Sequence, residues 1–260
     1  MKLIGMDLHI HSALSPCGGQ EMTPPKIMEQ ARRVGLGALV IADHNSAENQ
    51  EAFLECGKRM NMQILPGIEV QSREDVHILC IFDTLEQVLM CQQLVYNYLP
   101  EIQNNKEVFG HQEILDWQGN VIAENDRLLL TATNISLDDI VKYVHGIGGL
   151  AIPAHIDRPA FSLWMNLGFI PEELGLLGVE LTPHLKRKKE QIQFIREKGL
   201  GVLLSSDAHW LNQISGPFMW GSIEKFTVNE LKMALKGEQG RYLTYKEENN
   251  PYKIFEEEWD

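Results

Sequence analysis

The chain has 260 residues, of which 44% are hydrophobic and 23% are charged, a composition typical of a globular protein with a large core. Its formal net charge of −13 argues against nonspecific binding to nucleic acid or to an anionic membrane, because such binding needs clustered Lys and Arg. Its four cysteines form no Cys-x-x-Cys pair, which disfavours a structural zinc ribbon.

Short apolar strands alternate with amphipathic helices along most of the chain. Lys2–His11 is predicted to be a strand, and Thr23 with Pro24 and Pro25 begins a helix that runs to about Gly35. The later predicted elements, in chain order, are strand Leu36–Asp43, a helix capped by Ser46 and ending near Met60, strands Gln63–Val70 and Val76–Phe82, helices Leu85–Leu99 and Leu137–His145, strands Gly148–Ala154 and Gly178–Leu181, helix Lys186–Lys198, strand Gly201–Ser206, helix Thr227–Lys236 and strand Tyr242–Tyr245. This alternation predicts parallel strands with helices outside them, and a functional site at the carboxyl ends of the strands.

Residues 100–133 interrupt the alternation. The segment Asp116-Trp117-Gln118-Gly119-Asn120 is a turn signal between the runs Val108–Leu115 and Val121–Ala123. We expect an inserted hairpin or extended loop, and its role as a lid or as packing stays open. We assign residues 1–245 to one domain and residues 246–260 to an acidic tail with interleaved aromatic residues, which we interpret as a docked or frayed terminus rather than a partner-binding motif.

Five short segments contain residue types that bind metal ions. They are Asp7-Leu8-His9-Ile10-His11, Ala42-Asp43-His44-Asn45, Gly67-Ile68-Glu69-Val70 with His77 close behind, Pro153-Ala154-His155, and Ser206-Asp207-Ala208-His209. Six of the nine histidines lie in these segments. Because each segment borders a predicted strand, the fold would gather them at one edge, and we interpret them as one metal site.

Residue spacing supports shared ligation. Positions i and i+2 of a strand point to the same side, so His9 and His11 can face one ion. Asp207 and His209 have the same spacing. A carboxylate can bridge two cations through its two oxygens, which makes Glu69 the candidate bridge. We expect Asp7 to orient a ligating imidazole.

Other residues keep two interpretations. Asp43 with His44 also fits a strand end that caps itself, and His77 and His155 taken singly fit satisfied core or surface histidines. Cys17 is either a turn cysteine or a thiolate ligand, and a thiolate favours zinc or iron over magnesium.

Arg158 also keeps two interpretations. It would either bind a phosphate through paired hydrogen bonds or pair with Asp157 at the surface.

The five segments resemble the PHP (polymerase and histidinol phosphatase) family. The family's order of Asp-x-His-x-His, strand-ending Asp-His, Gly-x-Glu, a following His, Ala-His and a terminal Asp-x-His occurs here between residues 7 and 209. The resemblance implies an α/β fold, a distorted (β/α)7 barrel similar to a TIM barrel, with a metal site at the C-terminal ends of the strands. It also implies a three-metal cluster that hydrolyses phosphate esters.

The resemblance also implies a ligand set. His9, His11, Glu69 and Asp207 would bind a first ion, His44 and His209 a second, and His77 and His155 with the bridging Glu69 a third. Cys17 stands about where other members have a His or Asp that binds the second ion, and His155-Ile156 stands where many have His-Pro.

We expect a metal-dependent phosphoesterase that hydrolyses a small phosphomonoester through a hydroxide bridging two or three divalent ions (zinc, manganese or iron). Arg158 and the metals would balance charge on the phosphoryl oxygens, and Asp207 or His209 would handle protons. The alternatives are amide hydrolysis on a similar metal barrel and a non-catalytic, metal-stabilised module that binds a partner through the acidic tail.

The sequence also suggests a location and partners. Asp7 precedes any apolar region of a signal peptide, and no apolar run approaches the ~20 residues of a membrane span. We therefore expect a cytoplasmic protein with reduced thiols. We expect a small phosphorylated substrate, no membrane and no extended nucleic acid, with the oligomeric state open.

Overall fold

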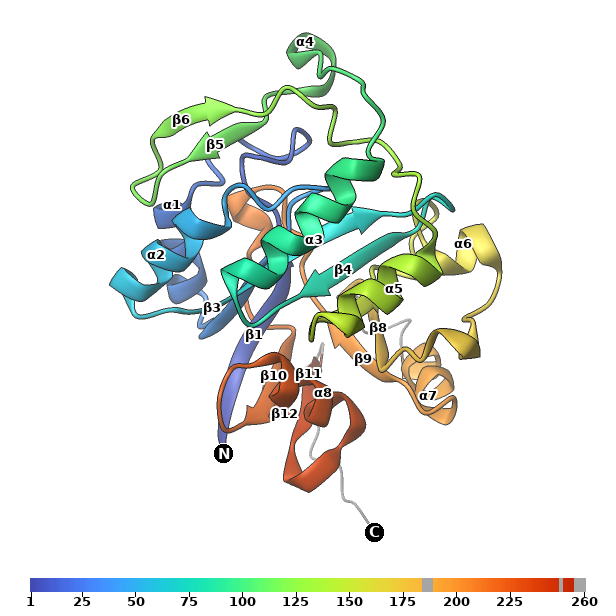
Figure 1. The fold of residues 1–260 in the computed structure, drawn as a ribbon. Coiled ribbons are helices and arrows are strands. Elements are labelled where there is room, and N and C mark those ends of the chain that lie inside the picture. The colour runs from blue at the N-terminus through green and yellow to red at the C-terminus, as the bar shows by residue number, and fades with distance from the viewer. Residues whose placement is uncertain (184–188, 248–249, 255–260) are drawn as a thin grey trace.

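The structure, a computed structural model, describes residues 1–183, 189–247 and 250–254 (Figure 1). The strands are β1 Lys2–Ile10, β2 Ala38–Ile41, β3 Gln63–Gln71, β4 His77–Ile81, β5 Glu113–Leu115, β6 Val121–Glu124, β7 Leu150–Pro153, β8 Gly178–Leu181, β9 Gly201–Leu204, β10 Met219–Ile223, β11 Tyr242–Glu247 and β12 Asn250–Ile254. The α-helices are α1 Pro24–Arg33, α2 Gln50–Met60, α3 Leu85–Tyr98, α4 Lys106–Phe109, α5 Leu137–Gly146, α6 Leu163–Leu167, α7 Lys189–Glu197 and α8 Val228–Lys236, with short 3₁₀ helices at Glu172–Leu174, Leu211–Gln213 and Glu238–Gly240.

A curled sheet forms the framework of this mixed α/β fold. Its order is β12-β11-β10-β1-β2-β3-β4-β7, and β8 pairs with β9 as a separate parallel pair. Backbone contacts connect this pair to the large sheet on both sides. Ile156 N donates to Glu180 O at 2.9 Å beside β7, and His11 N donates to Ala208 O at 2.9 Å beside β1. The curl resembles a distorted barrel.

The prediction of parallel strands is confirmed for β1, β2 and β3 but is wrong for β4, which runs antiparallel to both β3 and β7. The turn at 72–76, rather than a crossover helix, joins β3 to β4, so the chain returns directly alongside β3. The first residue of β4, His77, therefore pairs with Gln71 at the end of β3. The reversed strand brings His77 to the edge where the parallel strands end. The strands β10, β11 and β12 add a second antiparallel portion next to β1.

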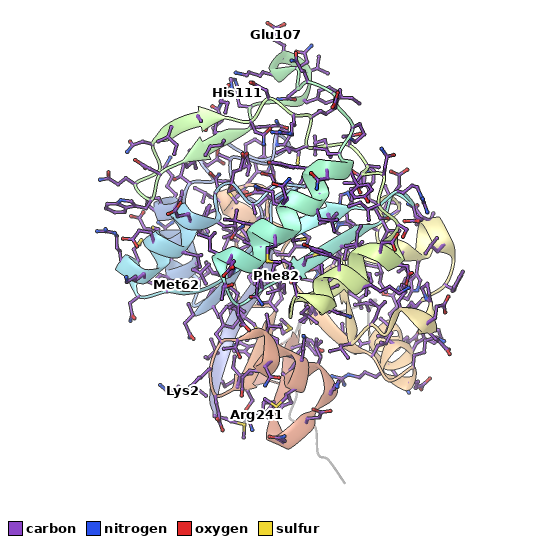
Figure 2. All side chains as sticks on the ribbon, in the orientation of Figure 1. Lys2, Met62, Phe82, Glu107, His111 and Arg241 are labelled. Carbon is purple, nitrogen blue, oxygen red and sulfur yellow. The ribbon has the colours of Figure 1, made fainter. Side chains whose placement is uncertain are left out.

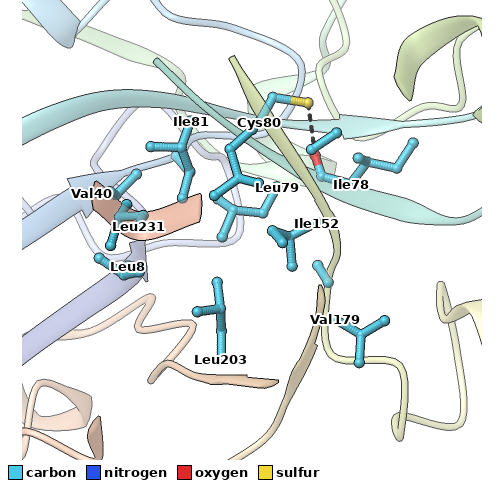
Figure 3. Packing of buried hydrophobic residues seen from close by; sticks show 14 of the residues in the cluster. Leu8, Val40, Ile78, Leu79, Cys80, Ile81, Ile152, Val179, Leu203 and Leu231 are labelled. Carbon is cyan, nitrogen blue, oxygen red and sulfur yellow. Dashed lines mark hydrogen bonds between the residues drawn. The ribbon is translucent and has the colours of Figure 1, made fainter. Parts of the chain in front are cut away.

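The strands bury most of their apolar side chains in one large cluster, and a smaller second cluster contains Ile10, Leu39 and Ile41. Leu8, Val40, Leu79, Ile152 and Leu203, from five different strands, belong to the large cluster and are fully buried (Figure 3). Helices α2 and α3 contact β3, α5 contacts β7 and α7 contacts β9. The core is therefore apolar, and the polar residues that can form a site lie at the ends of the strands.

The first helix begins as predicted, with Thr23 before Pro24 and Pro25. The second begins later than predicted, because Asn49 and not Ser46 is its N-terminal cap residue. Asn45, directly before Ser46, has a left-handed backbone conformation (φ 51°), which does not occur within a right-handed helix. The Ser46 hydroxyl instead lies 2.7 Å from the hydroxyl of Tyr96.

The predicted hairpin is present as β5 and β6, which pair antiparallel, and a short helix, α4, precedes it. Asp116 Oδ1 accepts hydrogen bonds from the backbone N–H groups of Gln118 and Asn120, both at 2.9 Å. The side chain of Asn49 connects the hairpin to α2, accepting from Leu115 N at 2.8 Å. Figure 2 shows Glu107 in this insertion at the opposite side of the molecule from Lys2 and Arg241.

Some elements were not predicted from the sequence, among them α6, β10 and β12. Within β10, a Cβ atom at Gly221 would lie 2.5 Å from the Met6 side chain, so close packing explains a glycine that weakens the strand signal. Residues 186–188 of the predicted helix, and residues 248–249 and 255–260 of the predicted tail, lie outside the described residues. In the part of the chain that the structure describes, no helix is long and apolar enough to cross a membrane.

Candidate metal centre

The carboxylate of Glu69, on β3, lies at the centre of the candidate site and is almost completely buried. Imidazole nitrogens approach it from four segments of the chain. Their distances to the nearest Glu69 oxygen are 2.7 Å for His44 Nδ1, 3.0 Å for His77 Nδ1, 3.1 Å for His155 Nε2, 3.4 Å for His9 Nε2 and 3.5 Å for His11 Nε2. The structure therefore brings these sequence-predicted residues together around one carboxylate.

Asp207, which follows β9, closes the other side of this cluster. Its Oδ1 lies 2.8 Å from His11 Nε2 and 3.5 Å from His9 Nε2. The ring of His209 stacks on that of His11, with 4.0 Å between centroids. All the predicted histidine and carboxylate ligands thus lie within one connected group.

Several buried atoms in this group form no hydrogen bond of good geometry. Among the described residues these include His155 Nδ1, Glu69 Oε2 and Asp207 Oδ1, although His44 Nδ1 lies 2.7 Å from Glu69 Oε2 and His11 Nε2 lies 2.8 Å from Asp207 Oδ1. Three sets of possible ligand atoms each lie within 4.8 Å of one another: His9, His11 and Glu69; His44, Glu69 and His77; and His11, His44 and His209. Nitrogen and oxygen lone pairs that converge in this way fit a divalent cation, and imidazole with carboxylate suits zinc, manganese or iron. The donor set therefore fits a metal centre.

The buried charges shift one another's pKa values when no cation is bound. Burial raises the pKa of Glu69, but the charge of His77 and the other imidazoles holds it well below its usual range. Burial lowers the pKa of His9, but the charge of Glu180 and other carboxylates raises it well above its usual value. The pKa of His11 lies well below its usual value because of burial and the neighbouring imidazoles. Protons on some imidazoles thus supply positive charge that a metal ion would otherwise supply.

Glu180, on β8, is a site residue that the sequence reasoning missed. Its Oε2 lies 2.9 Å from His9 Nδ1 and accepts a hydrogen bond from His155 N at 3.1 Å. This contact leaves the other ring nitrogen of His9 facing Glu69 and Asp207. An ionisable residue inside the apolar strand Gly178–Leu181 was the signal that could have identified it.

Asp7 does not orient an imidazole, contrary to the prediction. Its Oδ1 accepts from Ser206 N at 3.0 Å and from His9 N at 3.4 Å, so it connects the backbones of two site segments. Burial raises its pKa to about 6. The orienting role that was expected of Asp7 belongs to Glu180.

Asp43 supports the loop after β1 rather than capping its own strand end. It accepts hydrogen bonds from Ser12 N at 2.6 Å, Ser12 Oγ at 2.6 Å and Ser15 Oγ at 2.7 Å. The same Ser15 hydroxyl lies 2.9 Å from His11 Nδ1. Asp43 therefore positions His11 through Ser15.

Cys17 lies in an exposed turn of this loop, next to His44 and His209. Gly19 N donates to His209 O at 2.8 Å and connects the turn to the site. Partial burial raises the pKa of the thiol, but the charge of His44 and hydrogen bonds with His209 and His44 outweigh it and lower the pKa to about 6. Whether this thiolate binds a metal stays a prediction.

One of the two interpretations of Arg158, a surface pair with Asp157, is wrong. Its guanidinium lies 2.5 Å from Asp207 Oδ2 at the edge of the site. Asp157 instead accepts from Thr182 N at 2.9 Å and from Thr182 Oγ1 at 2.6 Å. A half-exposed cation thus borders the candidate metal ligands.

Comparison with known proteins gives a family and a fold. The PHP domain profile matches residues 7–164, more than half of the chain. A phosphoribosyl 1,2-cyclic phosphate 1,2-diphosphodiesterase from Eggerthella lenta is 35% identical over 78 residues, which cover 28% of this chain and 29% of that protein. The structure of a lesion-specific endonuclease from Pyrococcus furiosus shares the fold with a TM-score of 0.70 at 23% identity, over 93% of this chain and 58% of that one. The chain thus spans less than two thirds of the length of these relatives.

The prediction that excluded an extended nucleic acid is wrong. A structure of Endonuclease Q with a 27-mer duplex at its active site has the same fold over 93% of this chain, with a TM-score of 0.69 and 23% identity. Net charge describes the whole surface, whereas a substrate contacts only the surface around the site, where bound cations would add positive charge. The net charge of −13 therefore does not exclude a nucleic-acid substrate.

Proposed function

This chain belongs to the PHP domain family, and from that premise we propose that it is a metal-dependent phosphoesterase that cleaves phosphodiester bonds. The observation that carries the proposal is the convergence of five imidazoles on Glu69, with Asp207 beside them. We propose a diester rather than a monoester as the substrate because two similar proteins are a diphosphodiesterase and an endonuclease.

The proposed ligand set is the one that the resemblance to the PHP family implies, and each of its three groups shares at least two residues with a cluster of donor atoms. His9, His11, Glu69 and Asp207 would hold one ion, His44 and His209 with Cys17 a second, and His77 and His155 with Glu69 a third. When bound, such ions would lower the pKa of a water molecule and offset negative charge on the phosphate. Two or three ions would contact the buried oxygen and nitrogen atoms that form no hydrogen bond of good geometry.

Two residues at the edge of the site have proposed roles in the reaction. Arg158 would donate hydrogen bonds to the non-bridging phosphate oxygens, where a guanidinium gives paired contacts. His209, which follows β9 and stacks on His11, would hold the proton that the leaving oxygen needs. Asp207 is the poorer proton donor, because burial raises its pKa but the charge of His9 and the contacts with His11 hold that pKa well below its usual range.

The test is product release from matched esters by protein loaded with manganese, iron or zinc. The panel holds a dinucleotide diester, a nucleoside monophosphate, a sugar phosphate and an amide. We expect cleavage of the diester. In Asp207→Asn the rate should fall at least about 100-fold, because loss of even a hydrogen-bond partner of a ligand costs ~10–100-fold. Asp138→Asn, at an exposed position on α5, is the matched control and should retain the wild-type rate.

Each other outcome has a distinct meaning. Cleavage of the monoesters alone would reject the diester but retain the phosphoesterase. Cleavage of the amide alone would reject phosphate chemistry. A metal-loaded protein that cleaves none of the panel would favour a non-catalytic module.

A further inference from the structure

The loop that follows β7 contributes two different side chains to the edge of the candidate metal centre. It begins at His155, whose backbone carbonyl accepts from Arg158 N at 2.9 Å, and it ends at Ser162, whose hydroxyl donates to Arg158 O at 2.7 Å. Arg158 reaches Asp207 on one side of the cluster. Phe161 contacts His77 on another. One short loop therefore presents a cation and an aromatic ring to the same site.

The ring of Phe161 stacks on a histidine of the candidate site. It lies parallel to the imidazole of His77, with 4.9 Å between centroids and 17° between planes. The residue nevertheless remains 46% exposed. An apolar ring that packs on a site histidine and keeps this exposure offers a surface on which a flat ligand group can stack.

The backbone of Phe161 supports a functional interpretation. Its φ of 54° is in the left-handed region, which bulky residues rarely adopt. Asn45, His155 and Asp207 at the same site also have positive φ, but Asn, Asp and His tolerate this conformation better than Phe. A hydrogen bond from His77 N to Phe161 O, at 3.0 Å, holds the strained residue in place. Such strain costs free energy and is found mainly at binding and catalytic sites.

We propose that Phe161 is a specificity-determining residue that stacks on a nucleobase of the substrate beside the phosphate ester. This inference rests on the proposed function, because it names the substrate class of that site as nucleotide or nucleic-acid diesters. Arg158 would contact the phosphate, and Phe161 would contact a base attached to a neighbouring sugar. Every base has a flat face, so stacking would favour a base over no base without selecting one sequence.

The experiment compares dinucleotide diesters that carry both bases with otherwise identical diesters in which one nucleoside is replaced by a base-free tetrahydrofuran sugar. For the wild-type protein, loss of the stacked base should raise KM about tenfold. Phe161→Ala should raise KM for the two-base diester by about the same factor, leave KM for that base-free diester unchanged, and keep kcat within about twofold. Phe161→Trp, which retains a ring, should behave like the wild type.

Two controls separate stacking from a structural role. Phe169→Ala removes another exposed phenylalanine and should change no KM. Metal content is measured for each variant, because Phe161 also packs on His77. Equal increases in KM for both diesters in Phe161→Ala, a lowered metal content, or no change at all would overturn the proposal.

A binding measurement separates this inference from the proposed function. A dinucleotide with 2-aminopurine loses fluorescence when its base stacks, whether or not it is cleaved. Quenching that Phe161→Ala abolishes, in a protein that cleaves no diester, would retain the stacking site and reject the proposed function. Diester cleavage without any quenching that depends on Phe161 would retain the proposed function and reject the stacking site.

Discussion

At the scale of single residues, Glu180 shows how much of a metal centre depends on residues that need not touch the metal. One buried carboxylate contacts Nδ1 of His9, which lies on β1, and the backbone of His155, which follows β7. The contact keeps the orientation of the His9 ring and leaves Nε2 directed at Glu69 and Asp207. A residue of this kind sets metal affinity through the ligand that it holds.

We therefore predict that Glu180→Gln lowers metal affinity about 10- to 100-fold while the protein stays folded. The amide keeps the shape of the side chain but removes the charge that raises the basicity of His9. Titration with zinc or manganese, followed by calorimetry, measures the change. Glu173→Gln, at an exposed position, is the control, and equal affinity in both variants would contradict the orienting role.

Cys17 gives a second prediction at this scale. Its pKa of about 6 means that, in metal-free protein, the reactive thiolate should form as the pH rises through 6. The rate of alkylation by iodoacetamide should increase up to about pH 7 and then level off, whereas an ordinary cysteine reacts faster up to about pH 9. Mass spectrometry identifies the modified residue, since the other three cysteines are buried.

The same reaction tests whether Cys17 binds metal. If the thiolate is a ligand, saturating zinc should slow its alkylation strongly at every pH. Cys17→Ser provides the background rate. Unchanged alkylation in metal-loaded protein would remove Cys17 from the ligand set, and a rate that still rises above pH 8 would contradict the lowered pKa.

At the scale of elements, the reversed strand β4 and the inserted hairpin shape the site. The reversal of β4 delivers His77 from the start of a strand. The hairpin contacts the loop after β1, because Glu113 N donates to Ala13 O at 2.9 Å, and Gly110 just before the hairpin lies so close to the backbone oxygen of Pro16 that a Cβ atom would not fit. The insertion is thus packed against the Cys17 loop, and this contact favours a supporting role.

Asn49 is the residue through which we would test that packing. Its side chain accepts from Leu115 N and donates to Glu113 O and Ser12 Oγ, at 2.8, 3.0 and 2.9 Å. We predict that Asn49→Ala lowers the free energy of unfolding by about 2 kcal/mol, because buried partners lose their hydrogen bonds. Backbone hydrogen exchange should accelerate mainly in residues 113–124.

The control for this prediction is Asn97→Ala, at an exposed position on α3. It should leave both the stability and the exchange of the hairpin unchanged. Asn49 makes no side-chain hydrogen bond that caps α2, so loss of a helix cap does not complicate the result. Exchange that stays slow in the Asn49 variant would show that other contacts hold the hairpin.

At the scale of the whole molecule, the chain combines a net charge of −13 with a buried cluster of imidazoles and carboxylates. Bound cations would reduce the net charge and contact the buried atoms that form no hydrogen bond of good geometry. Because metal would bind the folded chain and not the unfolded one, its binding free energy adds to stability.

We predict that removal of metal by a chelator lowers the melting temperature by roughly 8–16 °C. This range follows from about 4 kcal/mol of binding free energy at ~1,000 times Kd and from the size of the protein. Differential scanning calorimetry with and without chelator measures it. Asp207→Asn should show a smaller difference and Asp138→Asn the full one, and equal melting temperatures with and without metal would contradict a metal centre.

The sequence by itself determined the candidate ligands and the segments that carry them. Apolar runs and ligand-type residues at their ends are local features, so strands such as β1, β2 and β9 were predicted, with His9, His44 and Asp207 at or just beyond their ends. The hairpin was predicted for the same reason, because its turn residues are contiguous.

Only the tertiary structure decided the direction of β4, the partner of Arg158 and the contacts that Glu180 and Phe161 make with site histidines. Each depends on contacts between segments far apart in the chain: His9 with Glu180, Arg158 with Asp207, and His77 with Phe161. The local sequence shows the chemical type of a side chain. Which residues that side chain contacts depends on the curl of the sheet and on the order of its strands, because these bring distant segments together.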